Sequence, residues 1–200
     1  DITYIMLNNG DVCYLHLITD AYSRMIVGWE LADTLRASIT IKALEQAISQ
    51  TGGVSLEDLT HHSDRGVQYC CDDYVRMLQT HKIKISMTED YNPTDNAIAE
   101  RANGVIKTET VYSRKTFNSL EHARNVIGRF IHFYNYRRPH MSIGYKIPAV
   151  VHTETGAQKK MWKKKNYPKK AYNNGNNGIS LPCRTTGADD GCNHHTVYSI

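Results

Sequence analysis

Three carboxylic acids stand where predicted strands and a helix could bring them together. Asp1 begins the first predicted strand, Asp64 closes the fourth, inside HHSDRGVQY (61–69), and Glu100 lies in the helix after the fifth. Clustered carboxylates repel one another unless a cation neutralises them. Mg²⁺ and Mn²⁺ prefer oxygen ligands, and two such ions about 3.5–4 Å apart can clamp both oxygens of a phosphodiester displacement. The acids therefore indicate metal-assisted phosphodiester chemistry, with three unrelated surface acids as the alternative.

The segment around Glu100 has the periodicity of a helix with two faces. At about 100° per residue, its apolar residues fall on one stripe: Ile98, Ala102, Val105 and Ile106. Glu100, Asn103 and Lys107 fall on the opposite face. We therefore expect this polar face to approach a metal ion and a phosphate backbone together.

Patterns of apolar residues predict the elements that would hold these acids. The predicted strands are 1–8, 12–19, 25–31, 59–63 and 83–88, and the predicted helices are 37–49, 72–81, 96–111 and 119–136. Three antiparallel strands followed by strand–helix crossovers predict an α/β fold, with a mixed five-stranded sheet flanked by helices. In such a sheet the first and fourth strands are neighbours, so the ends that carry Asp1 and Asp64 would meet.

The net charge of +4 hides an asymmetry along the chain. Residues 1–100 hold 7 Lys/Arg and 15 Asp/Glu, net −8, whereas residues 101–170 hold 16 and 3, net +13. The acidic part could gather divalent cations, and the basic part suits a polyanion. Two solvated faces without a partner are the simpler explanation, but the size of the basic block favours nucleic acid.

Composition also bounds the class of protein and its domains. No apolar run approaches the roughly 18 residues of a transmembrane helix, and no signal peptide opens the chain. Five cysteines without framework spacing indicate reduced thiols in an intracellular, cytoplasmic protein. We expect one domain over residues 1–150. Residues 151–200 should form a basic run and a flexible tail, because residues 171–200 hold too few apolar groups for a core.

Several blocks resemble, in order, those of integrase-like insertion-sequence transposases. They are DITYI, LITDAYSRMIVGW, HHSDRGVQY, YNPTDNAIAERANGVIKTE and FYNYRRPHMSIGYKIP, within about residues 1–150. The 35 residues between Asp64 and Glu100 match the D-D-35-E spacing of the retroviral integrase superfamily. The resemblance implies a ribonuclease-H-like fold and a DNA transposase core that cleaves and joins strands at element ends. The alternatives are a ribonuclease-H-like nuclease that cuts without joining, and a decayed fragment that only binds DNA.

The same resemblance assigns roles to particular residues. Asp1, Asp64 and Glu100 would be the catalytic acids and the ligands of Mg²⁺ or Mn²⁺, with two ions. Asn103 and Lys107 match positions that face the active site, with Lys107 suited to the DNA backbone. The resemblance further implies a homo-oligomer assembled on DNA, associated with the nucleoid and not with a membrane.

The residues near Asp64 and Asp20 leave several alternatives open. Asp20 is a rival first acid, although a turn aspartate that caps its own backbone is the simpler interpretation. His61 and His62 are adjacent in a strand and point to opposite faces, so at most one could face the site. Arg65 is a candidate phosphate contact.

The basic half offers further candidates for DNA contacts. Arg138 and His140 either contact DNA or fix the last helix to the core, and we expect Tyr134 to be structural. The run Lys163, Lys164 and Lys165 is a candidate for non-specific phosphate contacts. In the tail, Cys183, Cys192, His194 and His195 fit no trusted zinc spacing.

The chain as given begins on its first acid, as an N-terminally truncated core. A free α-ammonium, with an ordinary pKa of about 8, would share the residue with the Asp1 carboxylate. We expect this charge to compete with a divalent cation, and the terminal residue to fray.

Overall fold

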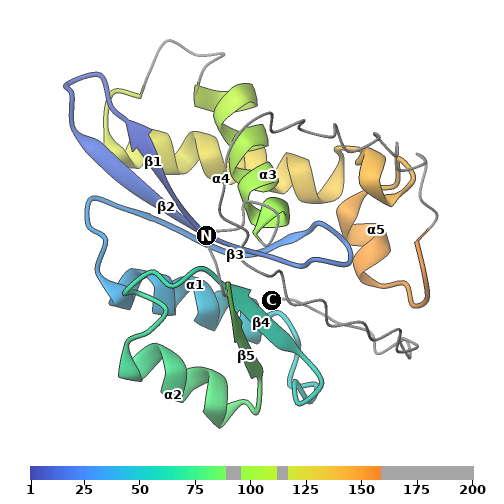
Figure 1. Ribbon diagram of the computed structural model, residues 1–200. Helices are drawn as coiled ribbons and strands as arrows, with labels where there is room; N and C mark the ends of the chain where they lie inside the picture. The colour runs from blue at the N-terminus through green and yellow to red at the C-terminus, as the bar shows by residue number, and fades with distance from the viewer. Residues whose placement is uncertain (89–95, 112–116, 159–200) are drawn as a thin grey trace, which may run out of the picture. The chain divides into compact units, whose positions relative to one another are not determined.

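The computed structural model describes residues 1–88, 96–111 and 117–158 (Figure 1). Its strands are β1 (Ile2–Met6), β2 (Val12–Thr19), β3 (Ile26–Ala32), β4 (Thr60–Ser63) and β5 (Lys84–Met87). Its helices are α1 (Ala37–Ser49), α2 (Asp72–Thr80), α3 (Ala97–Ile106), α4 (Leu120–Tyr136) and α5 (Pro148–His152). A π-helical turn, η1 (Lys107–Val111), continues α3, and a 3₁₀ turn, η2 (Met141–Ile143), precedes α5. The lysines 163–165 and the predicted tail lie outside the described residues.

β1, β2 and β3 form an antiparallel meander in that order. The Asn-Gly turn closes the first hairpin, because Gly10 takes a φ of +88° that few other residues tolerate. Opposite residues across the sheet share a face, so Thr3 pairs with Leu15 and Leu15 with Leu31. The register shifts between Ile18 and Thr19, just where β2 approaches Asp20.

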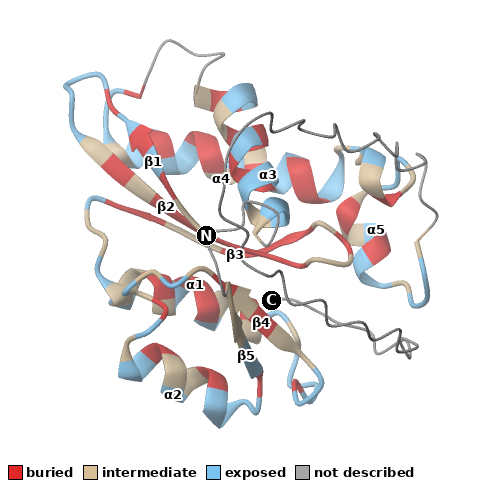
Figure 2. Ribbon diagram, viewed as in Figure 1, coloured by how far each residue is buried: buried red, intermediate tan, exposed pale blue. Residues whose placement is uncertain are grey.

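Helices bury both faces of this sheet. On one face, Ile5, Leu15 and Leu31 belong to a core shared with Ile106 of α3 and Ile127 of α4. On the other face, β2 and β3 join a second core with α1, α2 and the residue before β5; its members include Ile18, Val27, Leu44, Tyr74, Leu78 and Ile83. Figure 2 shows buried stretches along the sheet and on the sides of α1, α3 and α4 that face it.

The five strands form two sheets in the described part of the chain, not one. β4 and β5 pair in parallel, from Thr60 opposite Lys84 to Ser63 opposite Met87, and no ladder joins β1 to β4. The α/β class, with antiparallel and then parallel strands flanked by helices, is confirmed, but the single continuous sheet is not. Four-residue parallel strands gain little from ladder hydrogen bonds, and side-chain packing around α1 and α2 connects the layers instead.

The segment after η2 is hydrogen-bonded to the β2–β3 turn. Asp20, which is only 4% exposed, accepts hydrogen bonds from the backbone N–H groups of Tyr22 and Ser23. His152 Nδ1 lies 3.0 Å from the same carboxylate, and Tyr22 Oη donates to the Gly156 carbonyl. Burial alone would raise the pKa of Asp20, but these hydrogen bonds lower it below its ordinary value. Asp20 is therefore a turn-capping acid, and the packed fold continues beyond residue 150.

His16 makes the stability of the fold depend on pH. It is almost fully buried, its Nδ1 lies 2.9 Å from Thr40 Oγ1, and burial lowers its pKa to about 4. When the pH falls below about 6.5, the ordinary pKa of histidine, His16 becomes protonated in the unfolded chain but stays neutral in the folded protein. The free energy of unfolding therefore decreases as the pH falls toward 4. Between pH 7 and pH 5 we expect a loss of about 2 kcal/mol from this residue. Urea unfolding of wild type and His16→Gln checks this, because the variant should lose less stability over that interval.

Candidate active site

Asp1 is held at the start of β1 by contacts to two elements. Its amino group donates to the Leu17 carbonyl, and the Leu17 N–H donates to the Asp1 carbonyl, both at 2.9 Å. Its carboxylate accepts the Ile2 N–H at Oδ1 and the Asn103 side-chain amide at Oδ2, 2.8 Å away. The terminal residue is thus paired with β2 and fixed by α3, contrary to the fraying expected from the sequence.

The α-amino group of Asp1 is buried. Burial lowers the pKa of this group from 8.0 to about 6, and the nearby charge of Asp64 opposes the shift only in part. Asp64 is therefore close enough to Asp1 to influence its amino group, and Asp1 lines one hollow together with His61 and His62 of β4, the strand that Asp64 follows.

Asp64 lies directly after β4, in a tight turn that its own side chain closes. Its Oδ1 accepts the Gly66 N–H at 2.9 Å, the side-chain-to-backbone bond of an aspartate turn. A Cβ at Gly66 would lie 3.0 Å from that oxygen and 3.3 Å from the Tyr69 ring. The glycine therefore leaves room for the Asp64 carboxylate.

The two histidines before Asp64 serve different neighbours. His61 is buried, with its Nε2 3.2 Å from Tyr74 Oη. His62 is half-buried, and its Nδ1 lies 2.9 Å from Ser86 Oγ on β5. Both line a hollow of about 240 Å³ beside Asp1 that the start of α3 also borders. These bonds join β4 to α2 and β5, so the pair supports the strand that ends at Asp64.

Glu100 and Asn103 do not share one polar face, which corrects the expectation from helical spacing. Asn103 is only 5% exposed, because its amide reaches the Asp1 carboxylate on the buried side of α3. Its Oδ1 has no hydrogen-bond partner among the described residues. Glu100 is exposed and lines a different hollow, together with Arg101 and Arg138. Asn103 therefore supports Asp1. Its side chain is too buried to make the contact with DNA that was expected from the sequence.

The three acids offer suitable metal ligands but are not gathered. Their oxygens are the donors that Mg²⁺ and Mn²⁺ prefer. Asp64 is near enough to influence the charge of the Asp1 amino group, whereas Glu100, in the first turn of α3, lines a different hollow from Asp1. Within the described residues, no three His, Cys, Asp or Glu side chains come close enough together to hold a metal ion. The donor chemistry of the three acids fits such an ion.

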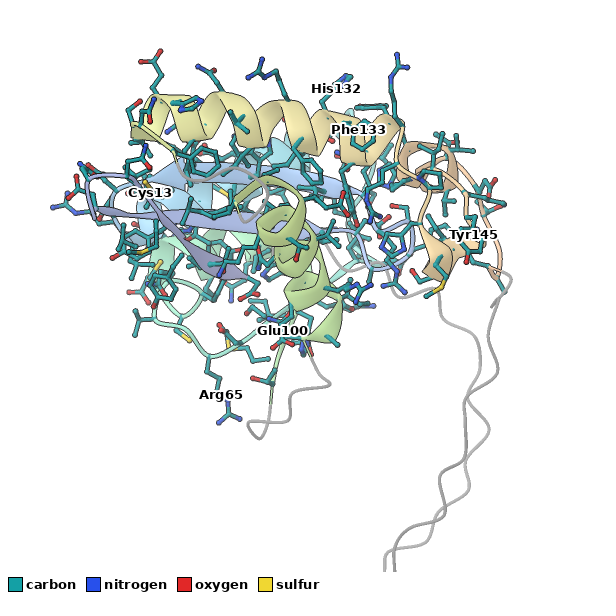
Figure 3. The ribbon with its side chains drawn as sticks, turned by 90° about the horizontal axis from the view of Figure 1, so that it is seen from above. Cys13, Arg65, Glu100, His132, Phe133 and Tyr145 are labelled. Carbon is teal, nitrogen blue, oxygen red and sulfur yellow. The ribbon has the colours of Figure 1, made fainter. Side chains whose placement is uncertain are left out.

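The remaining predicted contacts occupy different surroundings. Arg65 is exposed, and in the view of Figure 3 its side chain projects away from the ribbon near the end of α3 that carries Glu100. Lys107 is half-buried at the start of η1. Arg138 donates hydrogen bonds to the Glu109 carboxylate from two guanidinium nitrogens. Its Cζ atom lies over the Tyr134 ring, 5.8 Å from the ring centroid. Tyr134 is buried, as expected for a structural residue.

His140 lies in a strongly cationic environment. Its Nδ1 is 2.9 Å from Ser142 Oγ and accepts the Ser142 N–H, which caps η2. Burial, together with the charges of Arg24, Arg138 and Arg101, lowers the pKa of His140 to about 4. His140 is therefore neutral at pH 7 and structural in this turn, among three guanidinium groups from three elements.

Asn103→Leu should weaken metal binding without unfolding the protein. Leucine has a similar volume, but it removes the amide that orients Asp1 Oδ2. Loss of such an orienting partner typically weakens metal affinity about 10–100-fold. Titration with Mn²⁺, followed by electron paramagnetic resonance, measures this directly. An affinity equal to that of wild type, with an unchanged melting temperature, would show that Asp1 needs no support from α3.

Comparison with solved structures defines the fold. The HTLV-2 integrase catalytic core domain, solved in complex with magnesium, superposes with a TM-score of 0.58 at 21% identity. That match covers 76% of this chain and 92% of that one. A chain in the structure of the simian T-cell lymphotropic virus intasome in complex with PP2A regulatory subunit B56 gamma gives a TM-score of 0.64 at 20% identity, and the match covers 82% of this chain and 56% of that one. The predicted ribonuclease-H-like α/β fold is thereby confirmed.

Sequence comparisons define the family. Two models, each described as the integrase core domain, match residues 1–93 and 81–148. A Mycobacterium tuberculosis protein described as a candidate transposase for insertion sequence element IS986/IS6110 is 35% identical over 162 residues, covering 80% of this chain. The transposase InsF for insertion sequence IS3A of Escherichia coli is 31% identical over 145 residues, covering 72%. The chain belongs to the integrase core domain family, and it spans 58% and 49% of the length of these relatives.

Proposed function

We propose that this chain is the catalytic core of a DNA transposase, which cleaves phosphodiester bonds at element ends and transfers the strand to a target duplex. The observation that carries the proposal is the placement of Asp1 beside β4, in a hollow that His61 and His62 also line, with Asn103 hydrogen-bonded to Asp1. Asp64 is held in the turn directly after that strand by its bond to Gly66. Membership of the integrase core domain family supports it, as does the likeness to insertion-sequence transposases.

In this proposal Asp1, Asp64 and Glu100 are the catalytic acids and hold Mg²⁺ or Mn²⁺, in two sites. When bound, the ions would stabilise the charge that develops at the attacking and leaving oxygens. The task of the protein is then to position the acids and the DNA. Because Glu100 stands apart from the others in the described structure, we infer that it joins them when cation and DNA bind.

The proposed DNA contacts include the exposed Arg65, which directly follows Asp64, and the half-buried Lys107 at the start of η1. They also include Arg138, which lies in the hollow that Glu100 lines. In this proposal His140 contributes by capping η2 and does not contact the DNA itself. Lys163, Lys164 and Lys165 would add non-specific phosphate contacts. Action at two element ends implies a homo-oligomer on DNA, associated with the nucleoid. None of the described helices has both the length and the apolar character needed to span a bilayer.

An assay of cleavage and joining on end-labelled duplexes tests the proposal. The chain is incubated with labelled duplex and unlabelled target, with Mg²⁺, Mn²⁺ or chelator, and the products are sized on denaturing gels. Metal-dependent nicks together with longer joined strands are the expected result. Nicks without joining would identify a ribonuclease-H-like nuclease instead, and binding without any nick would indicate a non-catalytic DNA-binding fragment.

A further inference from the structure

An open hollow of about 540 Å³ lies along the exposed side of α3 and η1, and Arg138, just after the C-terminal end of α4, borders it. Glu100, Gly104 and Thr108 follow one another at helical spacing along its floor, and Arg101, Glu109 and Arg138 complete its walls. The π-helical turn η1 follows directly on α3, and it carries Glu109 to Arg138, 29 residues further along the chain. Turns of this kind are frequent at functional sites.

Gly104 leaves the floor of the hollow bare. Glycine within a helix costs stability relative to alanine, so it calls for a reason. No packing reason exists among the described residues, because a Cβ at this position would meet nothing within 4 Å. Gly28 differs from Gly104 in this respect, because a Cβ at Gly28 would collide with the backbone of α1. A bare stretch of helix backbone allows close approach by a ligand.

Two arginines give the hollow its chemistry. Arg101 is exposed, and Arg138 is oriented by its bonds to Glu109 and by the Tyr134 ring. Planar guanidinium groups suit the paired oxygens of a phosphate. Burial is the main cause of the low pKa of His140, and the positive charges of these two arginines and Arg24 lower it in the same direction. Glu109 occupies one side of Arg138, and the charge of Glu100 would be offset by a bound cation, so a singly charged phosphodiester suits the hollow better than a free dianion.

We propose that this hollow holds a backbone phosphodiester of the DNA, next to the one that reacts, with Arg101 and Arg138 as its donors and Gly104 as its floor. The inference rests on the proposed function and adds a specific phosphate site to it. It also explains why an exposed glycine lies one helical turn after Glu100.

Gly104→Leu and Arg101→Gln test the phosphate site in the full chain. Binding of a fluorescein-labelled DNA duplex is measured by anisotropy over a series of salt concentrations. Gly104→Leu should weaken binding at least tenfold while the melting temperature stays equal or rises, because leucine is the better helix former. Arg101→Gln should weaken binding and lower the slope of log affinity against log salt by about 0.9, the loss of one phosphate contact.

Ser38→Leu on α1 and Arg76→Gln on α2 are the matched controls, because both residues are exposed on helices outside the hollow. Wild-type affinity in Gly104→Leu, an unchanged salt slope in Arg101→Gln, or no duplex binding by wild type would each overturn the phosphate site. The cleavage assay separates this failure from that of the proposed function. Cleavage with no effect of Gly104→Leu rejects only the hollow, whereas binding that depends on Gly104 without cleavage rejects only the chemistry.

Discussion

Asp64→Asn is expected to lower the rate of metal-dependent DNA cleavage on the order of a thousandfold and to leave DNA binding unchanged. Metal-assisted stabilisation of the developing charge is worth several kcal/mol, and each 1.36 kcal/mol is about a tenfold change in rate. Asparagine keeps the oxygen that accepts the Gly66 N–H, so the turn after β4 should survive. Gel-based nicking rates with Mg²⁺ and with Mn²⁺ measure the effect.

Asp58→Asn is the matched control for this substitution. Its side chain is 99% exposed and lies 4.0 Å from Lys84, so removing its charge should change neither stability nor cleavage. A nicking rate for Asp64→Asn equal to that of the control would remove Asp64 from the reaction.

Gly28→Ala is expected to destabilise the fold by about 3 kcal/mol or more, through overpacking between β3 and α1. An added Cβ would lie 2.1 Å from the Ala43 carbonyl oxygen and 3.2 Å from the Ala47 Cβ. The obstacle is helix backbone, so α1 as a whole would have to move away from the sheet. Urea unfolding followed by circular dichroism gives the change in free energy.

Gly104→Ala is the internal comparison for Gly28→Ala. Its new methyl group meets nothing, so this variant should be stable or gain up to about 1 kcal/mol from helix propensity. Equal stability of the two alanine variants would mean that α1 does not pack against β3 as closely as the structure places it.

The local elements could be predicted because their signals are local. Strand β2 and helix α1 begin and end where alternation and helical spacing predicted. The predicted helix over 96–111 continues in η1, whose π-helical turn the apolar spacing does not distinguish from α-helix. Helix α5 was missed, although Pro148 at its first turn is a recognised start signal.

The site depended on contacts that spacing alone does not encode. Helical angles placed Asn103 with Glu100, but the decisive partner of Asn103 is Asp1, 102 residues away. Arg138 similarly finds Glu109 across a turn and a helix. The separation into two sheets follows from the short ladder of β4 and β5 rather than from any residue pattern. The sequence pattern does not explain Gly104 inside a helix, and the proposed phosphate site in the hollow gives that glycine a reason.

The central claim is that Asp1, Asp64 and Glu100 bind the same ions when DNA is present. Paramagnetic broadening of backbone amide resonances by Mn²⁺, in the DNA complex, tests it most directly. At substoichiometric Mn²⁺ the amides of Ile2, Gly66 and Arg101, each next to one of the acids or within its turn, should broaden together, and Asp64→Asn should abolish all three effects. Broadening at Ile2 and Gly66 that leaves Arg101 sharp would contradict the claim, because Glu100 would then take no part in binding the metal.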